Sequence, residues 1–478
     1  MTLAYHGPLS ETAPAMVLYV DRRDQGGGDP PVLLSPWERF RKVAAVIENF
    51  AGLSRRVVVV DGCRTPFCRS GTAFTDLKSY DLGRMAVSGL LHRTKIDPEV
   101  VDLLVMGTVI ADPATSNLGR EVVLASQLPD SCPAYTVSVA CVSSLQSFLD
   151  AARAIATGGA DVAIAAGAET LSDAPIRYRR SVRKRLIKAQ KARGPGDYLA
   201  LFKGLGPSDL LPEPVALAEF STGEIMGQNC ERLAKRYGIT REAQDAYAAR
   251  AHQRAAAATA DGELARQITP AFVPPKGKAV REDNGIRGDS TVESLAKLRP
   301  AFDRRFGTIT AGNSSYLTDG GAAVLLASEE AARKLGLEPI ATLRSAAVAA
   351  LDPLEELLLG PALTLPQALD SAGLGLPDVG VVELHEAFAA QVLAVLQLLD
   401  DPEWCSERLG RDTPVGTVEL DRLNTWGGSL SVGHPFGATG ARLITNCCQR
   451  MAAEDAKYGV VAACAAGAIG IGMVFERA

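Results

Sequence analysis

Continuous apolar runs alternate with stretches of helical periodicity along most of this chain. Runs rich in β-branched residues are typical of buried strands and cover 56–61, 101–109, 135–139, 162–166, 308–310 and 322–326. Between two of these runs, apolar residues recur at three- and four-residue steps and predict a helix over 143–156. Strands that alternate with helices predict a layered α/β architecture.

A second unit of the same kind begins near Ile340. Its predicted strands cover 379–384, 429–432, 460–463 and 469–475, with helices after His385 and from Gly437. Each unit places a reactive residue, Cys141 or His434, between a strand and a helix. This shared order suggests an internal duplication, although residue identity between the halves is too low to prove one.

Two regions depart from this rhythm. Residues 1–55 predict an N-terminal extension, with a glycine- and proline-rich break at 26–31 and one short helix over 36–50. Residues 173–299 are richer in charge and proline, and they predict an inserted domain with helices over 227–237 and 241–258. The expected division is therefore 1–55, 56–172 completed by 300–335, 173–299, and 336–478.

Composition excludes several classes of protein. A chain of 478 residues is too long for a single hydrophobic core and suggests more than one domain. Its net charge of −5 gives no general attraction to nucleic acid. Nine cysteines without a CxxC pair argue against a disulfide scaffold or structural zinc site and suit a reducing compartment. Because the start resembles neither a signal peptide nor a presequence and no long apolar run occurs, we expect a cytoplasmic protein.

Four short segments carry the candidate chemistry. Cys141, His385, His434 and Cys464 each sit beside small residues where a strand or turn meets another element. A cysteine at the start of a helix meets unpaired N–H groups and the positive end of the helix dipole, which favour the thiolate. Taken singly, each residue has a structural alternative: a core cysteine, a turn histidine or a helix-capping histidine.

Together, two cysteines and two histidines suit a Claisen-type reaction on thioesters. Such a reaction needs a covalent nucleophile to hold the acyl group, a base for the carbon acid, and donors for the enolate oxygen. Cys141 suits the first role and Cys464 the second. His434 could take the Cys141 proton, and His385 could donate to the enolate, with Glu386 as a possible orienting partner.

These motifs resemble the thiolase family, in particular the trifunctional-enzyme β-subunit and its bacterial counterparts. The resemblance covers about 56–478. It is carried by Ala140–Ser144, Leu298–Phe302, Thr310–Ser315, Asp319–Ala323, His385–Phe388, Asn424–Leu430, Gly433–Gly440 and Cys464–Gly467. It implies two similar five-stranded α/β halves in an αβαβα arrangement, with the insertion at 173–299 over the coenzyme A (CoA) site.

The resemblance also implies roles for the site residues. Cys141 would be the acylated nucleophile, activated by His434, and Cys464 the acid/base. His385 stands where many thiolases have asparagine, and the backbone N–H groups of Cys141 and Ala466 would form a second oxyanion hole. The positions implied to contact the pantetheine of CoA are Met226, Ala311, Gly312, Ser315, Ala387 and Phe388.

The implied activity is the cleavage of 3-ketoacyl-CoA by CoA in fatty-acid β-oxidation, with no permanent cofactor or metal. A short-chain acetyl-CoA acetyltransferase, a β-ketoacyl synthase and a non-catalytic acyl-CoA-binding subunit are the alternatives. The synthase is disfavoured because 427–433 holds no lysine and Cys464 is present.

Implied partners are a second copy of the chain and a hydratase/dehydrogenase subunit. Ile225 stands where some relatives have histidine, so no CoA contact is assigned to it, and Gly467–Gly470 departs from the family pattern near Cys464, which leaves substrate choice open.

One motif lies outside this set. Arg177–Arg193 holds nine basic residues and no acidic one, with Ser172 or Asp173 as a possible cap for a helix that starts near Pro175. Val182, Leu186 and Ile187 give it an apolar face. A solvated face, binding of CoA phosphates or a partner subunit, and peripheral contact with an anionic membrane are the three interpretations.

Overall fold

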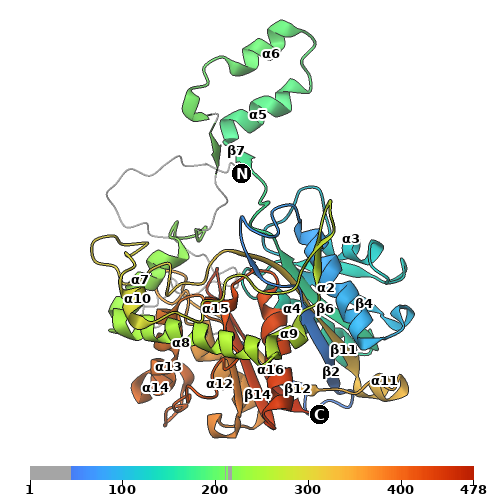
Figure 1. Ribbon diagram of the computed structural model, residues 1–478, viewed down its shortest axis with the longest axis vertical. Coiled ribbons are helices and arrows are strands. Elements are labelled where there is room, and N and C mark those ends of the chain that lie inside the picture. The colour runs from blue at the N-terminus through green and yellow to red at the C-terminus, as the bar shows by residue number, and fades with distance from the viewer. Residues whose placement is uncertain (1–44, 210, 214–217) are drawn as a thin grey trace, which may run out of the picture. The chain divides into compact units, whose positions relative to one another are not determined.

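The computed structural model describes residues 45–209, 211–213 and 218–478 (Figure 1). Its main sheet has the spatial order β13-β14-β15-β12-β2-β11-β6-β4-β5, with β1 beside β12 and β3 beside β11. The N-terminal strands are β2 (Val57–Arg64), β3 (Cys68–Arg69), β4 (Leu103–Gly107), β5 (Ala134–Val137), β6 (Val162–Glu169) and β11 (Thr318–Ser328). The others are β1 (Ala45–Asn49), β12 (Ala341–Ala350), β13 (Val381–Leu384), β14 (Tyr458–Ala465) and β15 (Ile469–Arg477).

The two halves of this sheet repeat one topology. In β4-β6-β11-β2 the first pair is parallel and the next two are antiparallel, and β13-β14-β15-β12 has the same sequence of senses. β5 lies parallel to β4, and the matching place beside β13 holds only an isolated parallel bridge between Val382 and Leu423. The duplication expected from the sequence is confirmed in this topology.

Helices cover the sheets in layers. The helices of the two halves are α2 (Ser79–Thr94), α3 (Leu118–Leu124), α4 (Ser143–Ala156), α11 (Glu329–Lys334), α12 (Gly360–Ala372), α13 (Ala389–Leu399), α14 (Pro402–Leu409), α15 (Ser429–Val432) and α16 (Thr439–Ala453). α4 and α16 contact each other and the strands of both halves, while α2 packs on β11 and β6, and α12 on β15 and β12. This order confirms the predicted αβαβα arrangement.

Burial on both faces explains why the central strands read as continuous apolar runs. Ala163 and Ala165 of β6 belong to the cluster around α4 and α16, whereas Val162 and Ile164 belong to the cluster around α2. Because successive side chains point to opposite faces, a strand between two helical layers must be apolar at every position. Within the described ranges, no helix is both long enough and apolar enough to cross a membrane.

Several sequence predictions of secondary structure were wrong. Ala45–Asn49, inside the helix predicted over 36–50, is strand β1, paired with β12; residues 36–44 lie outside the described part. The strand predicted over 429–432 is the helical turn α15, which ends at Gly433 with φ +100. Of 308–310, only Thr310 pairs, in an isolated bridge with Pro300. Such short alternating or apolar segments take their conformation from long-range partners rather than from their own pattern.

The segment between β6 and β11 forms its own set of elements. These are β7 (Arg177–Tyr178), α5 (Arg180–Ala189), α6 (Pro195–Phe202), β8 (Pro212–Glu213), α7 (Met226–Arg236), α8 (Arg241–Ala260), α9 (Glu263–Gln267), β9 (Ala271–Val273), β10 (Lys278–Val280) and α10 (Val292–Ala296). The predicted cap for the basic helix was wrong: α5 starts at Arg180, and the Ser172 hydroxyl donates to Asp319 instead. α5 and α6 contact each other (Figure 1), whereas α7 and α8 pack on α13.

Candidate active site

Cys141 lies in the turn between β5 and α4. Ala140 before it has φ +45, a left-handed conformation that a residue with a β-carbon adopts at a cost. The Ser143 hydroxyl donates to the Ala140 carbonyl (2.7 Å) and accepts the Val139 N–H (2.9 Å). These bonds hold the turn, and Cys141 is partly exposed while the other eight cysteines are buried.

The electrostatics of Cys141 differ from the sequence prediction. Although part of the residue is exposed, burial around the sulfur raises the pKa of the thiol to about 12, and the nearby backbone N–H groups of Ala466 and of Cys141 itself offset this only in part. The helix start therefore does not offset the loss of solvent. Because only the thiolate is a strong nucleophile, this cysteine needs a base at the moment of reaction.

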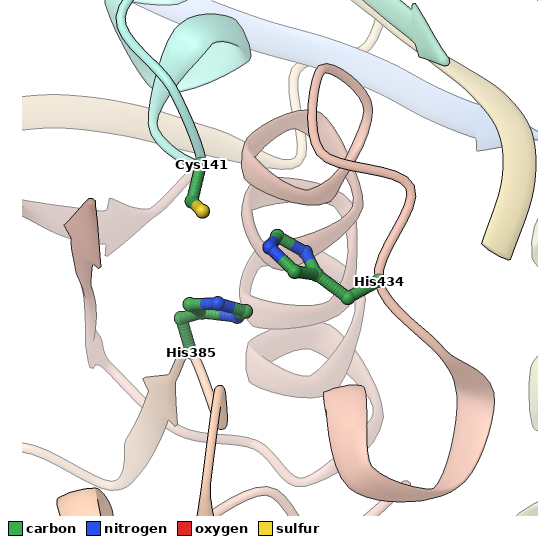
Figure 2. Close-up of side chains that lie close together, drawn as sticks. All are labelled: Cys141, His385 and His434. Atoms are coloured by element: carbon green, nitrogen blue, oxygen red, sulfur yellow. The ribbon is translucent and has the colours of Figure 1, made fainter. Parts of the chain in front are cut away.

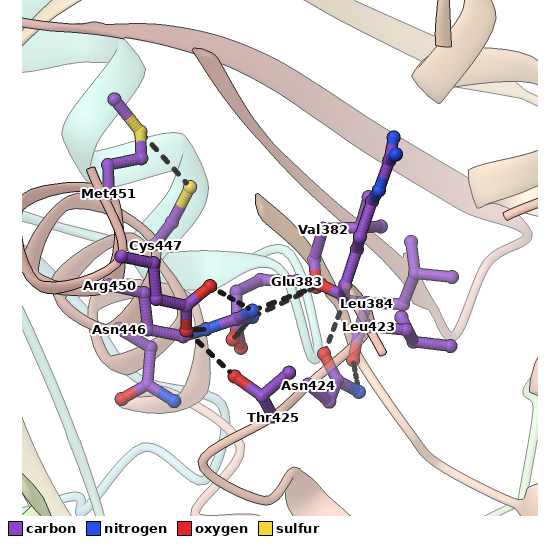
Figure 3. A network of polar contacts seen from close by, with 12 residues as sticks. Val382, Glu383, Leu384, Leu423, Asn424, Thr425, Asn446, Cys447, Arg450 and Met451 are labelled. Atoms are coloured by element: carbon purple, nitrogen blue, oxygen red, sulfur yellow. Dashed lines mark hydrogen bonds and ion pairs between the residues drawn. The ribbon is translucent and has the colours of Figure 1, made fainter. Parts of the chain in front are cut away.

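His385 directly follows β13, and a buried polar network holds the end of that strand (Figure 3). Asn424 accepts the Leu384 N–H (2.9 Å) and donates to the Leu384 carbonyl (2.9 Å), in a left-handed conformation with φ +47. Arg450 donates to Glu383 (2.7 Å), and both are fully buried. These bonds, together with the His385 N–H bond to the Ala462 carbonyl (2.9 Å), fix the backbone from which the His385 ring projects.

The ring of His385 has one partner and one free nitrogen. Its Nδ1 lies 3.0 Å from the Ser429 hydroxyl on α15. Its Nε2 is buried and has no hydrogen-bond partner among the described residues. Burial, aided by the Arg442 charge, lowers the pKa of His385 to about 3, so the ring is neutral near pH 7.

His434 lies in the turn that leads from α15 into α16. Gly433 has φ +100, and a β-carbon there would overlap the Thr318 side chain, whose hydroxyl accepts the His434 N–H at 3.0 Å. The His434 Nδ1 lies 2.6 Å from the Thr439 hydroxyl, and Nε2 again lacks a partner in the described structure. Burial, together with His385 and Arg442, holds the pKa of His434 well below its usual value.

The three side chains meet, as Figure 2 shows. The two imidazole rings have centroids 4.1 Å apart, and the Cys141 sulfur and one nitrogen of each ring lie within 4.8 Å of one another. The segment directly after β13, the α15–α16 turn and the β5–α4 turn are thus brought into one site. A thiol and two imidazoles could also hold a soft metal ion, and the absence of a metal expected from the sequence stays a prediction.

Cys464 completes the predicted set. It lies on β14 opposite Gly470 of β15, is buried, and has a pKa raised by burial and then by the proximity of Cys141. The turn that follows carries Ala466, whose N–H bonds the Cys141 sulfur. Glu219 of the insertion accepts the Gly467 N–H at 2.6 Å and so ties this turn to the segment at 218–225.

The predicted CoA-contact positions fall near this site. Ser315 donates its N–H to the Ala387 carbonyl (2.9 Å). The preceding residue, Ser314, forms an isolated antiparallel β-bridge with Phe388. Met226 and Ala387 pack against the same hydrophobic cluster, which includes Cys464. Ala311 and Gly312 belong to the loop just before Ser315. Their contact with CoA itself stays a prediction.

Sequence reasoning missed the residues that orient the site. Glu386, suggested as the partner of His385, instead accepts from Tyr247 (2.8 Å), Asn424 (2.6 Å) and the Leu430 N–H (3.1 Å). Ser429 and Thr439 lie inside the quoted motifs, but neither received a role. Membership of a motif was the only sequence signal for Ser429 and Thr439, because the fold decides which histidine each hydroxyl contacts.

Glu169, at the end of β6, was also missed. Its carboxylate accepts N–H groups from Val109, Ile110 and Gly437 (each 3.0 Å) and the Thr108 hydroxyl (3.2 Å). Burial nevertheless raises the pKa of Glu169 to about 7. The bond to Gly437 joins the N-terminal half to the turn that carries His434.

Comparison with known proteins gives one consistent family. The thiolase N-terminal domain matches residues 57–330, and the thiolase C-terminal domain matches residues 337–477. The chain is 45% identical over 421 residues to a 3-ketoacyl-CoA thiolase of Serratia proteamaculans, covering 88% of this chain and 97% of that protein. It is 46% identical to the mitochondrial trifunctional enzyme subunit beta of Bos taurus, with 88% of each chain covered.

A solved structure agrees with this assignment. Human mitochondrial 3-ketoacyl-CoA thiolase in complex with CoA is similar to this chain with a TM-score of 0.77 and 30% identity. The likeness covers 89% of this chain and 99% of that one. The similarity therefore extends through both halves and the insertion rather than to one half alone.

Proposed function

This chain belongs to the thiolase family, and we propose that it is a 3-ketoacyl-CoA thiolase that cleaves 3-ketoacyl-CoA with CoA in fatty-acid β-oxidation. The observation that carries the proposal is the convergence of Cys141, His385 and His434, with Cys464 beside them. One nucleophile, one base and an independent acid/base are what a two-step acyl transfer through a thioester needs.

In the first half-reaction, the Cys141 sulfur attacks the 3-keto carbon after His434 takes its proton. The C2–C3 bond then breaks, the acyl group stays on Cys141 as a thioester, and the electron pair forms the enolate of acetyl-CoA. Cys464 donates a proton to that enolate carbon, and acetyl-CoA leaves. His385 donates a hydrogen bond to the developing oxyanion, which lowers the barrier because the donor is itself buried.

In the second half-reaction, Cys464 takes the proton of the incoming CoA thiol. The CoA sulfur attacks the thioester carbon, and the Cys141 sulfur leaves and regains its proton from His434. We propose that the backbone N–H groups of Cys141 and Ala466, which lower the pKa of the Cys141 thiol, also donate to the oxygen of the thioester. The products are acyl-CoA and acetyl-CoA, and the kinetics are ping-pong.

CoA enters as a substrate rather than a permanently bound cofactor. We propose that Met226, Ala311, Gly312, Ser315, Ala387 and Phe388 contact its pantetheine and that the insertion over 173–299 covers it. Met226 and Ala387 pack against the hydrophobic cluster to which Cys464 belongs, which supports this placement. Alanine-to-leucine replacement at Ala387 is the direct test: KM for CoA should rise while the rate of Cys141 alkylation stays the same.

Thiolysis of 3-ketoacyl-CoAs of increasing chain length tests the function. Rates that hold or rise from acetoacetyl-CoA to long chains would support the proposal. Activity confined to acetoacetyl-CoA would instead favour a short-chain acetyltransferase, such as the Bacillus anthracis acetyl-CoA acetyltransferase, whose structure is also similar (TM-score 0.76, 29% identity). Failure of Cys141 to take up an acyl group from acetyl-CoA would favour a non-catalytic binding subunit.

A second proposal concerns partners. The bovine relative is a subunit of a trifunctional enzyme, and we propose that this chain forms a homo-oligomer that binds a hydratase/dehydrogenase subunit. Light scattering of the purified chain, alone and mixed with such a subunit, measures both. A monomer that stays separate from the added subunit would refute both parts.

We also propose that α5 and α6 contact anionic membranes. Leu199 and Ile176 are 74% and 73% exposed, and Phe202 is exposed as well, beside the cations of α5. Exposed apolar side chains with flanking cations suit an anionic bilayer surface. Flotation with phosphatidylglycerol vesicles should retain the protein at low salt, and Leu199→Glu should reduce retention, whereas Phe272→Glu on the distant strand β9 should not. Equal flotation of all three proteins would refute this contact.

A further inference from the structure

We propose that the two active-site histidines are held in opposite tautomers, His434 by Thr439 and His385 by a Ser429–Arg442 pair, so that one Nε2 accepts a proton and the other donates a hydrogen bond. This inference deepens the proposed function, because it names the positioning residues that assign a role to each ring. Both rings are neutral near pH 7, so each carries one ring proton, on Nδ1 or on Nε2.

For His434, the Thr439 hydroxyl decides the position of the proton. We assign the only hydrogen of that hydroxyl to the Pro435 carbonyl, which can only accept and lies 2.9 Å from Thr439 Oγ1. The 2.6 Å contact between Thr439 Oγ1 and His434 Nδ1 must then use a proton on the ring. His434 therefore carries its proton on Nδ1, and Nε2 presents a lone pair toward the site.

For His385, the same reasoning gives the opposite result. The Ser429 hydroxyl accepts an N–H from Arg442 (2.8 Å), and a guanidinium can only donate. Among the described contacts of Ser429 Oγ, the His385 Nδ1 is the one acceptor for its hydrogen (3.0 Å). A proton on Nδ1 would leave this buried hydroxyl hydrogen without a partner, which is unfavourable. His385 therefore carries its proton on Nε2.

Arg442 suits this task because its own position is restricted. It lies on α16, is buried, and sits 3.6 Å from the Glu383 carboxylate on β13. A buried guanidinium keeps its charge and cannot accept a hydrogen bond, so its direction of donation to Ser429 is fixed. Glu383 is in turn held by Arg450 at 2.7 Å (Figure 3).

The consequence for the chemistry follows from the two free nitrogens. Both Nε2 atoms are buried without a protein partner in the part of the chain described, and both rings face Cys141 (Figure 2). The lone pair of His434 can take the Cys141 proton, whereas the N–H of His385 can stabilise an oxyanion. Two identical side chains thus receive different roles from two hydroxyl groups.

Nitrogen NMR of histidine-labelled protein tests the tautomers without any activity. The chain has five histidines, so a spectrum that correlates ring nitrogens with ring carbon-bound protons can be assigned by single replacements. We expect the Nδ1–H pattern for His434 and the Nε2–H pattern for His385. The same tautomer in both rings would overturn the proposal, whether or not the protein proves to be a thiolase.

Replacement of Thr439 tests the link to the nucleophile. Thr439→Val removes the acceptor at Nδ1, so His434 should change tautomer and Cys141 alkylation by iodoacetamide should slow about tenfold, which corresponds to about 1.4 kcal/mol. Thr439→Ser keeps the hydroxyl and should restore the rate. Thr445→Val on the same helix is the matched control, since its buried hydroxyl donates to the Ala441 carbonyl (2.8 Å) in the same way but meets no histidine. Equal alkylation rates in Thr439→Val and the control would refute the role of Thr439.

Replacement of Ser429 should separate the two roles. Ser429→Ala should leave the alkylation rate of Cys141 within about twofold but slow the release of acetyl-CoA from 3-ketoacyl-CoA about tenfold, the effect of one lost hydrogen bond. Ser431→Ala is the matched control, because its hydroxyl is also buried on α15 but donates to the Gly428 carbonyl (3.0 Å). If Ser429→Ala slows alkylation as much as acetyl-CoA release, or leaves the His385 tautomer unchanged, the assignment for His385 is wrong.

Discussion

The two halves share one topology but contribute unequally to the site. In the N-terminal half, a long insertion joins β6 to β11, and in the C-terminal half a short turn at 466–468 joins the equivalent strands β14 and β15. The turns before α4 and α16 are equivalent too, and they hold Cys141 and His434. The N-terminal half supplies one reactive side chain, and the C-terminal half supplies His385, His434 and Cys464.

This difference shows how a duplicated fold can acquire one asymmetric reaction centre. α4 and α16 pack against each other, so the two equivalent turns face one another. A nucleophile in one turn then meets a base in the other without any change of backbone topology. The insertion of the N-terminal half contacts the short β14–β15 turn of the C-terminal half, because Glu219 accepts the Gly467 N–H.

Cys141→Ser should have the largest effect, because it removes the only reactive group of the N-terminal half. A serine hydroxyl is far less ionised than a thiol, so acylation should fall at least about 10³-fold. Mass spectrometry after incubation with acetyl-CoA would detect the adduct. Thiolysis at the wild-type rate would show that the nucleophile lies elsewhere.

Cys464→Ala should separate the two half-reactions. Loss of an acid/base typically costs about 10²–10⁴-fold. The variant should still take an acyl group from acetyl-CoA onto Cys141 but fail to form acetoacetyl-CoA. Rapid-quench measurement of acylation and steady-state condensation would give both rates. Normal condensation would remove Cys464 from the mechanism.

Glu169→Gln tests the contact between the halves through pH. Burial raises the pKa of Glu169 in the folded protein to about 7 from an ordinary value of 4.5, so between these values the folded state binds more protons than the unfolded state. Stability should therefore fall as pH rises through this range, by about 3 kcal/mol from this group. Urea unfolding at several pH values should show this decline in the wild type and lose it in Glu169→Gln. A decline of the same size in both proteins would assign it to another group.

Gly433→Ala and Ala140→Gly compare the equivalent turns. At Gly433 a methyl group would overlap Thr318 and meet a φ of +100, so we expect a loss of about 2 kcal/mol in the free energy of unfolding. At Ala140, φ is +45 with an alanine already present, and glycine should relieve strain but add freedom to the unfolded chain. The net change there should stay within about 0.5 kcal/mol. Thermal and urea unfolding would measure both, and equal losses would show that the two turns are under the same constraint.

Much of the fold could be predicted from sequence because its patterns are local. The helix predicted over 143–156 has those bounds in the structure, and the apolar runs at 162–166 and 322–326 are central strands. The prediction of a strand over 429–432 was wrong. Four buried residues between glycines are too few to show whether apolar positions repeat as in a strand or as in a helical turn. The helix predicted over 36–50 was wrong at Ala45–Asn49 for a similar reason, because the strand partner of this segment, β12, lies far along the chain.

The sequence by itself determined which chemical groups this protein has: two cysteines, two histidines and their small neighbours, in an order that is similar to the thiolase family. Only the tertiary structure decided what each group can do. It placed Ser429 rather than Glu386 beside His385, Thr439 beside His434, and the Ala466 N–H on the Cys141 sulfur. The physical reason is that protonation, tautomer and pKa depend on burial and on hydrogen-bond partners, and in this site several of those partners come from distant parts of the chain.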